Sequence, residues 1–337
     1  MPVLLVRLIS GLALSVLGGC GIDSGGAQAP APAASSSRSL LVVGPITGFG
    51  SVHVNGLTLQ TAETEILVDG NSVSESTLRE GQIIRAVAAV TSSSIDAVSI
   101  EYQVNVRGPV EVLDTAAGTL TVLGQQVHTN AETVLDFADG SSLNNLALPA
   151  RVEVSGFRLP SGVLRATYLG IAAPTAPLTV TTAISSVDAI ALTFELGGLT
   201  VDYSQVLVLD VPTGIPDVGL VVVVEGTDRG AGGELIVTRI RSLDAAPGAI
   251  VASDTAAPSF AAVGAAESID LRANILSVIT ASDLSSRITI GDVTVLIDAL
   301  TRVNNGIVDD LAPGRLVQVE GEIVSVGVIQ ADVIELF

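Results

Sequence analysis

Hydrophobic and polar residues alternate with a period of two over many short stretches of this chain. In "RVEVSG", Val152 and Val154 alternate with Arg151 and Glu153, which predicts a strand with one buried and one exposed face. β-Branched residues dominate these stretches, and no long segment repeats its apolar residues at a helical spacing. The pattern therefore predicts an all-β protein made of short strands.

Four stretches share a frame in which glycine bounds an apolar strand: "GQIIRAVA" (81–88), "PARVEVSG" (149–156), "GLVVVVEG" (219–226) and "GRLVQVEG" (314–321). In three copies a leucine stands three residues before the frame, at Leu78, Leu146 and Leu311. Each frame is followed by a second apolar strand, which ends around Ile100, Leu169, Ile240 or Ile334. This recurrence predicts tandem modules.

We define four modules from these repeats: module 1 (41–104), module 2 (105–172), module 3 (177–244) and module 4 (268–337). Residues 245–267 are Ala-rich with two prolines, which predicts a linker. Each module offers about five short strands. We expect small, closed or partly open, five-stranded OB-like β-barrels, because closure leaves no exposed strand edge. A small β-sandwich is the alternative.

The stretch "GPITGFGSVHVNG", Gly44 to Gly56, holds four glycines and resembles a ligand-cradling loop at first sight. A phosphate-binding loop needs a following helix with exposed amides, whereas "SVHVNGLTL" alternates like a pair of strands. Asn55-Gly56 predicts a type I′ hairpin turn. We expect Gly44 to open the first strand and Gly48 and Gly50 to permit a bulge or a tight bend.

The amino-terminal segment has the order of a secretory signal. Arg7 precedes an apolar run from Leu8 to Leu17, and small residues follow. Residues 1–19 therefore predict a signal peptide, since the apolar run is too short to span a bilayer as a helix. Residues 20–40 are rich in Gly, Ala, Pro and Ser and predict a flexible tether.

The end of this segment, "LGGC", resembles the lipobox of bacterial lipoproteins, with Leu17, Gly18 and Gly19 before Cys20. The resemblance implies that cleavage leaves Cys20 as the acylated first residue, anchored in a membrane through its lipid chains. The alternative is an ordinary signal peptide followed by a free thiol. Gly21 replaces the Asp of the inner-membrane retention signal, so we expect the outer membrane, on its periplasmic or surface face.

Composition and charge argue against several kinds of partner and binding site. All 15 basic residues are Arg, and against 35 acidic residues they give a formal net charge of −20, which argues against a nucleic-acid partner. Without Lys the chain has no Walker loop and no Schiff-base lysine. Its one cysteine excludes an internal disulfide and a Cys-based zinc site.

Two groups of residues are weak candidates for chemistry. His53 and His128 lie on predicted strands but not at matching positions of the repeat. Three polar loops could offer oxygen atoms to calcium: the loop with Asp136, Asp139 and Asn144, the loop with Asp69, and the loop with Asp309 and Asp310. None has the register of an EF-hand loop, and the turn preference of Asp, Asn and Gly explains them without a metal. We predict no catalytic residue, no metal site and no cofactor.

The motif "GPITGFGSVHVNG" and the later glycine frames resemble bacterial lipoproteins built of tandem β-rich domains of unknown function. The resemblance implies repeated small β-modules and supplies no catalytic residues. We therefore expect a lipid-anchored cell-envelope protein, a non-catalytic scaffold or binding module with an unidentified envelope or protein partner. The alternative is an extracytoplasmic hydrolase or a calcium-dependent binding protein.

Overall fold

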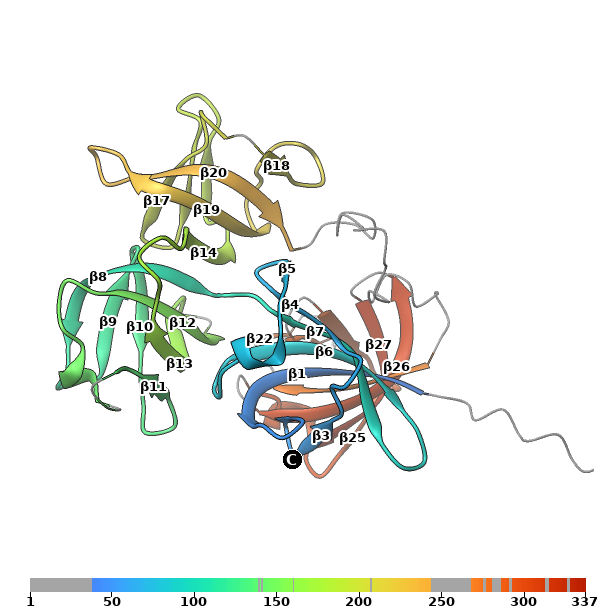
Figure 1. Ribbon diagram of the computed structural model, residues 1–337. Coiled ribbons are helices and arrows are strands. Elements are labelled where there is room, and N and C mark those ends of the chain that lie inside the picture. Colours follow the sequence, from blue (N-terminus) through green and yellow to red (C-terminus); the bar gives the residue numbers. More distant parts are fainter. Residues whose placement is uncertain are drawn as a thin grey trace, which may run out of the picture. The chain divides into compact units, whose positions relative to one another are not determined.

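The computed structural model describes residues 38–337, apart from 139, 141, 160, 207, 244–267, 275–276, 281–285, 291–292, 313–314 and 326–327. Within this part the protein is all-β, as the alternation predicted (Figure 1). The helices described are short 3₁₀ turns: η1 (Glu75–Thr77), η2 (Leu143–Asn145) and η4 (Val308–Asp310). None of the helices in the described part has the length or apolar character needed to cross a bilayer.

The strands follow one order in each module. Module 1 contains β1 (Arg38–Gly48), β2 (Val52–Val54), β3 (Leu57–Leu59), β4 (Glu65–Val68), β5 (Asn71–Ser72), β6 (Ile83–Val90) and β7 (Ile95–Tyr102). β1 begins at Arg38, within the predicted tether (20–40), and Leu40 is buried, so the predicted boundary at residue 41 is too late. Module 2 contains β8 (Val106–Asp114), β9 (Thr119–Val122), β10 (Gln125–His128), β11 (Val134–Asp136), β12 (Arg151–Arg158) and β13 (Leu164–Ile171).

Modules 3 and 4 repeat this order. Module 3 contains β14 (Leu178–Ala183), β15 (Ser186–Asp188), β16 (Thr193–Leu196), β17 (Leu199–Asp202), β18 (Val208–Asp210), β19 (Val221–Arg229) and β20 (Leu235–Ser242). Module 4 contains β21 (Ser268–Asn274), β22 (Ser277–Thr280), β23 (Ser286–Ile290), β24 (Val293–Ile297), β25 (Arg302–Asn304), β26 (Leu316–Ser325) and β27 (Val328–Leu336).

The pairing of strands repeats as well, and module 2 shows it most completely. β8 pairs antiparallel with β9, and β9 with β10. β10 then runs parallel to β13, which pairs antiparallel with β12, and β12 returns to β8. The hydrogen-bonded path through these five strands thus ends where it began. The parallel step recurs between β17 and β20 and between β24 and β27.

The repeated glycine frame has a physical cause in the penultimate strand of the modules. Register shifts occur at Gly156, Gly226 and Gly321, and at Ala88 in module 1. A Cβ at Gly156 would lie 2.2 Å from the backbone oxygen of Arg165, so the two strands approach too closely there for a side chain. The frame therefore marks a β-bulge, a feature that bends a strand and increases its twist.

The repeated leucines and strand ends are core positions. Leu78, Leu146 and Leu311 each follow a 3₁₀ turn as its C-cap residue and are buried. The four residues near the ends of the last strands are fully buried: Ile100, Leu169, Ile240 and Ile334. The apolar positions that recur in the sequence are thus the positions whose side chains are buried in the modules.

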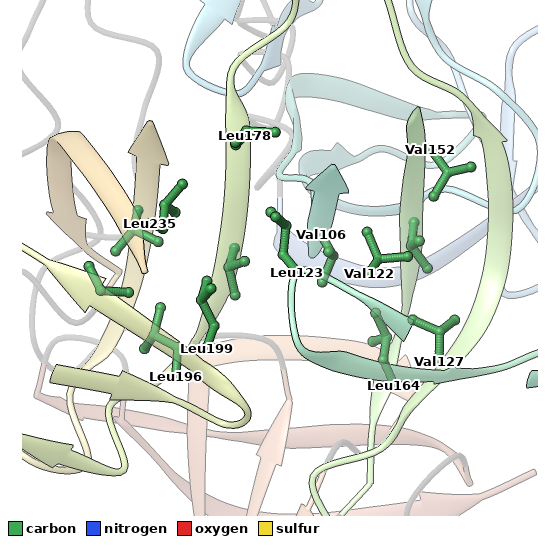
Figure 2. Close-up of a cluster of buried hydrophobic side chains, with 14 of the residues drawn as sticks. Val106, Val122, Leu123, Val127, Val152, Leu164, Leu178, Leu196, Leu199 and Leu235 are labelled. Atoms are coloured by element: carbon green, nitrogen blue, oxygen red, sulfur yellow. The ribbon is translucent and has the colours of Figure 1, made fainter. Parts of the chain in front are cut away.

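Strand pairing also crosses module boundaries. β1 of module 1 runs parallel to β21 of module 4, with Leu40 opposite Asp270. β8 of module 2 pairs antiparallel with β14 of module 3, and these two modules share one cluster of buried side chains. Figure 2 shows its labelled residues in two groups: Val122, Val127, Val152 and Leu164, and Leu196, Leu199 and Leu235. The modules are joined in pairs through their first strands.

The stretch from Gly44 to Gly56 forms strands and turns. Asn55 and Gly56 both have positive φ, and β2 and β3 pair antiparallel on either side of them, which confirms the predicted hairpin turn. The prediction that Gly44 opens the first strand is wrong, because Gly44 lies inside β1. A Cβ there would lie 2.4 Å from Oδ1 of Asn55, whose Nδ2 donates to the carbonyl oxygen of Val43 at 2.9 Å.

Candidate functional site

The most developed polar arrangement in the described residues is an ionic cluster where module 1 meets module 2. It begins at the turn between β4 and β5, where Asp69 and Gly70 both have positive φ. Oδ1 of Asp69 accepts hydrogen bonds from the backbone N–H of Val104 and from Nε2 of Gln103, each at 3.0 Å. Its Oδ2 accepts from Nη2 of Arg107 at 2.5 Å.

Arg107 is the centre of this cluster. It lies on β8, is only 7% exposed, and stands directly across from Glu153 on β12. Nε and Nη2 donate to Oε2 of Glu153 at 3.0 and 2.8 Å. The other oxygen, Oε1, accepts from the hydroxyl of Tyr102 at 2.9 Å and from Nε2 of Gln82 at 3.2 Å. Every carboxylate oxygen of Asp69 and Glu153 therefore has a donor.

The pKa directions agree with this geometry. Burial raises the pKa of Tyr102 well above its ordinary value, and the neighbouring Glu153 raises it further, so the phenol stays protonated and donates. Burial by itself lowers the pKa of Arg107, but Asp69 and Glu153 outweigh it and raise the pKa overall. The cluster thus holds the Arg107 guanidinium in its charged form between two carboxylate groups, with a protonated phenol beside Glu153.

Backbone contacts surround this cluster. The N–H of Ile83 donates to the hydroxyl of Ser155 at 2.9 Å, and Ser155 is fully buried. A Cβ at Gly81 would lie 2.4 Å from the backbone oxygen of Thr167, so the chain of module 1 approaches that of module 2 closely. Nη2 of Arg241, in module 3, donates to Oε1 of Gln103 at 2.6 Å. The triad of Asp69, Arg107 and Glu153 therefore belongs to the contact between modules 1 and 2, which we call the joint. Its role there is to position the two modules.

A groove of about 620 Å³ lies beside this joint. Its walls come from the 3₁₀ turn η1 and the residues after it, from β11, and from Tyr168 on β13. Nε of Arg79 faces Oδ2 of Asp136 at 3.7 Å, and the hydroxyl of Tyr168 donates to the same oxygen at 3.2 Å. Burial, followed by Asp136, raises the pKa of Tyr168 above its ordinary value, so its hydroxyl remains a donor.

The two histidines are in different sheets. His53 lies on β2, and its Nδ1 is 3.2 Å from the hydroxyl of Thr58. His128 is exposed on β10, where it lines a smaller hollow of about 210 Å³ with Gln126 and Val112. Among the described residues, no three His, Cys, Asp or Glu side chains are placed to share a metal ion.

The polar loops have structural partners. Asp69 holds Arg107, Asp136 faces Arg79, and Oδ2 of Asp310 accepts from the N–H of Ile307 at 2.9 Å. Asp139 and the predicted lipidation residues Leu17, Gly18, Gly19 and Cys20 lie outside the described residues.

Arg107 and Glu153 were not predicted as site residues. The sequence offers one indication, a single arginine in the otherwise mostly apolar stretch "VNVRGPVEV". The sequence alone does not show which carboxylate this arginine pairs with. Asp69 was noted for its loop, but its partner comes from another module.

The fold and this site define an all-β protein of tandem domains with a buried ionic cluster where modules 1 and 2 meet. Residues 107–169 and residues 277–335 each match the family described as a domain of unknown function (DUF5666). The matches lie within modules 2 and 4, and they show tandem domains of unknown function. None of the curated proteins matches the sequence.

Proposed function

We propose that this protein is a lipid-anchored, non-catalytic scaffold or binding protein of the bacterial cell envelope, built of OB-like β-barrel modules. The barrel interpretation is supported by the path β8–β9–β10–β13–β12–β8, which returns to its first strand. Alternate residues of β12 are buried, and Val152 and Val154 belong to a cluster of buried hydrophobic side chains, as expected for strands that enclose a core.

The observation that carries the scaffold role is the buried joint at Arg107. Domains in one chain move relative to each other by default unless their interface is large or strongly fixed. Here a charged triad with every carboxylate oxygen satisfied links module 1 to module 2. We infer that this ionic cluster restricts the movement of modules 1 and 2 relative to each other, which supports a scaffold role.

The joint can be tested by limited proteolysis of the full chain with proteinase K. We expect wild-type protein to resist cleavage between residues 102 and 107, because that segment is paired and buried, and the Arg107→Met variant to be cut there. Fragment masses locate the cleavage. Equal cleavage of both proteins in this segment would contradict a fixed joint.

The anchor is supported by the "LGGC" sequence at Leu17 to Cys20 and is tested separately. Cys20→Ala should move the protein from the membrane fraction to the soluble fraction, because it removes the acceptor of the lipid. Gly21→Asp keeps the acceptor and should shift the protein from the outer to the inner membrane. A Cys20→Ala protein that still sediments with membranes would refute the anchor.

A further inference from the structure

The groove beside the joint runs along the edge of a strand. Val134, Leu135 and Asp136 are consecutive residues of β11, and all three line it. Consecutive side chains of a strand point to opposite faces, so we infer from the three lining residues that the groove reaches the strand's edge. In the described part of the chain β11 pairs only with β13 and stands at the end of its sheet. The unpaired backbone groups of such an end strand can accept a further strand.

Apolar and aromatic side chains form a further part of the wall. Phe49, in the turn between β1 and β2, is 40% exposed, whereas Leu78 and Tyr168 are buried. A peptide strand laid against β11 would therefore cover apolar surface and place alternate side chains near an aromatic ring. Aromatic faces attract guanidinium and ammonium groups.

The groove also has an excess of negative charge. Glu75, Glu80 and Asp136 line it together with Arg79, which already faces Asp136. Glu75 accepts a hydrogen bond from the neutral hydroxyl of Thr61 and forms no salt bridge with any Arg or His of the described residues. A complementary partner is therefore cationic, and the whole chain, with its net charge of −20, favours the approach of such a partner.

We propose that an extended, cationic peptide segment of a partner protein binds in this groove and adds as a strand to the edge of β11. Backbone hydrogen bonds to β11 supply the affinity, and the carboxylates with Phe49 select Arg or Lys at alternate positions. The proposal rests on the proposed binding function and names the chemistry of its partner.

The probe is a fluorescein-labelled heptapeptide of alternating Arg and Val, titrated against the purified full chain in an uncharged detergent and followed by fluorescence anisotropy. Two companion peptides separate the contributions. One has Glu in place of Arg, and the other carries N-methyl groups on alternate amides, which removes backbone donors but keeps the charge. We expect saturable binding of the Arg peptide, no binding of the Glu peptide, and at least about tenfold weaker binding of the N-methylated one.

Matched double variants localise the site. Glu75→Gln with Glu80→Gln removes two charges from the groove and should weaken binding about fivefold. Asp332→Asn with Glu322→Gln removes two exposed charges from module 4, outside the groove, and should leave binding unchanged. Higher salt should weaken the wild-type complex, since part of the attraction is between exposed charges.

Three results would overturn the proposal: no saturable binding of the Arg peptide, equal weakening by both double variants, or undiminished binding of the N-methylated peptide. Fractionation of Cys20→Ala and proteolysis of Arg107→Met use no peptide. A failed groove is therefore distinguishable from a failed anchor or scaffold.

Discussion

Replacing Arg107 by methionine removes the guanidinium that joins Asp69 to Glu153 and leaves two carboxylates facing a buried apolar side chain. The side chains of these three residues are only 8%, 12% and 17% exposed, so water cannot fully solvate the stranded charges. Two unit charges about 4 Å apart attract each other by about 4 kcal/mol at an effective dielectric constant near 20, and desolvation of the ions offsets part of this. We expect Arg107→Met to lower the free energy of unfolding by about 3–5 kcal/mol.

Urea unfolding of the full chain measures this loss, and hydrogen exchange of residues 102–107 shows whether it begins at the joint. Arg79→Met is the matched control, because Arg79 and Asp136 are about half exposed and 3.7 Å apart, and it should cost less than about 1 kcal/mol. Adding Asp69→Asn and Glu153→Gln to Arg107→Met should recover part of the loss. If Arg107→Met costs no more than Arg79→Met, the triad does not stabilise the joint.

Three further predictions concern other parts of the chain. Gly156→Ala should cost about 3 kcal/mol in urea unfolding, because its Cβ meets the backbone oxygen of Arg165; Gly48→Ala, whose nearest neighbour would be 3.8 Å away, should cost less than about 1 kcal/mol. Burial lowers the pKa of Arg158 to about 10, and its Nη2 has no partner among the described residues, so the charged form is disfavoured in the folded chain. Arg158→Met should therefore raise the melting temperature at neutral pH, and a lower one would show that the charge is compensated. Calcium and EDTA should leave the melting temperature unchanged, whereas a rise with calcium would favour the calcium-dependent alternative.

Much of the fold follows from local sequence. The glycine frames predicted repeated modules, and the structure places Gly156, Gly226 and Gly321 at bulges of equivalent strands. The type I′ turn at Asn55 was predictable because few residues other than Asn and Gly accept positive φ.

The candidate site was much less predictable. In the sequence, Asp69 has the features of a turn residue and Arg107 is an isolated charge in a strand. No recognisable spacing between the two residues indicates that they form a pair. The groove was not predictable from the sequence either, since Phe49 and Leu135 belong to different modules and line the same groove only in the folded chain.

By itself, the sequence determined the all-β class, the repeating modules, the turns and the buried positions. These depend on the two-residue period of a strand and on backbone preferences, which act between neighbouring residues. Only the tertiary structure decided that β1 pairs with β21, that β8 pairs with β14, and that Arg107 lies between two carboxylates. Such contacts depend on which strand edges and side chains meet in space, and residues far apart in the chain carry no local signal of that meeting.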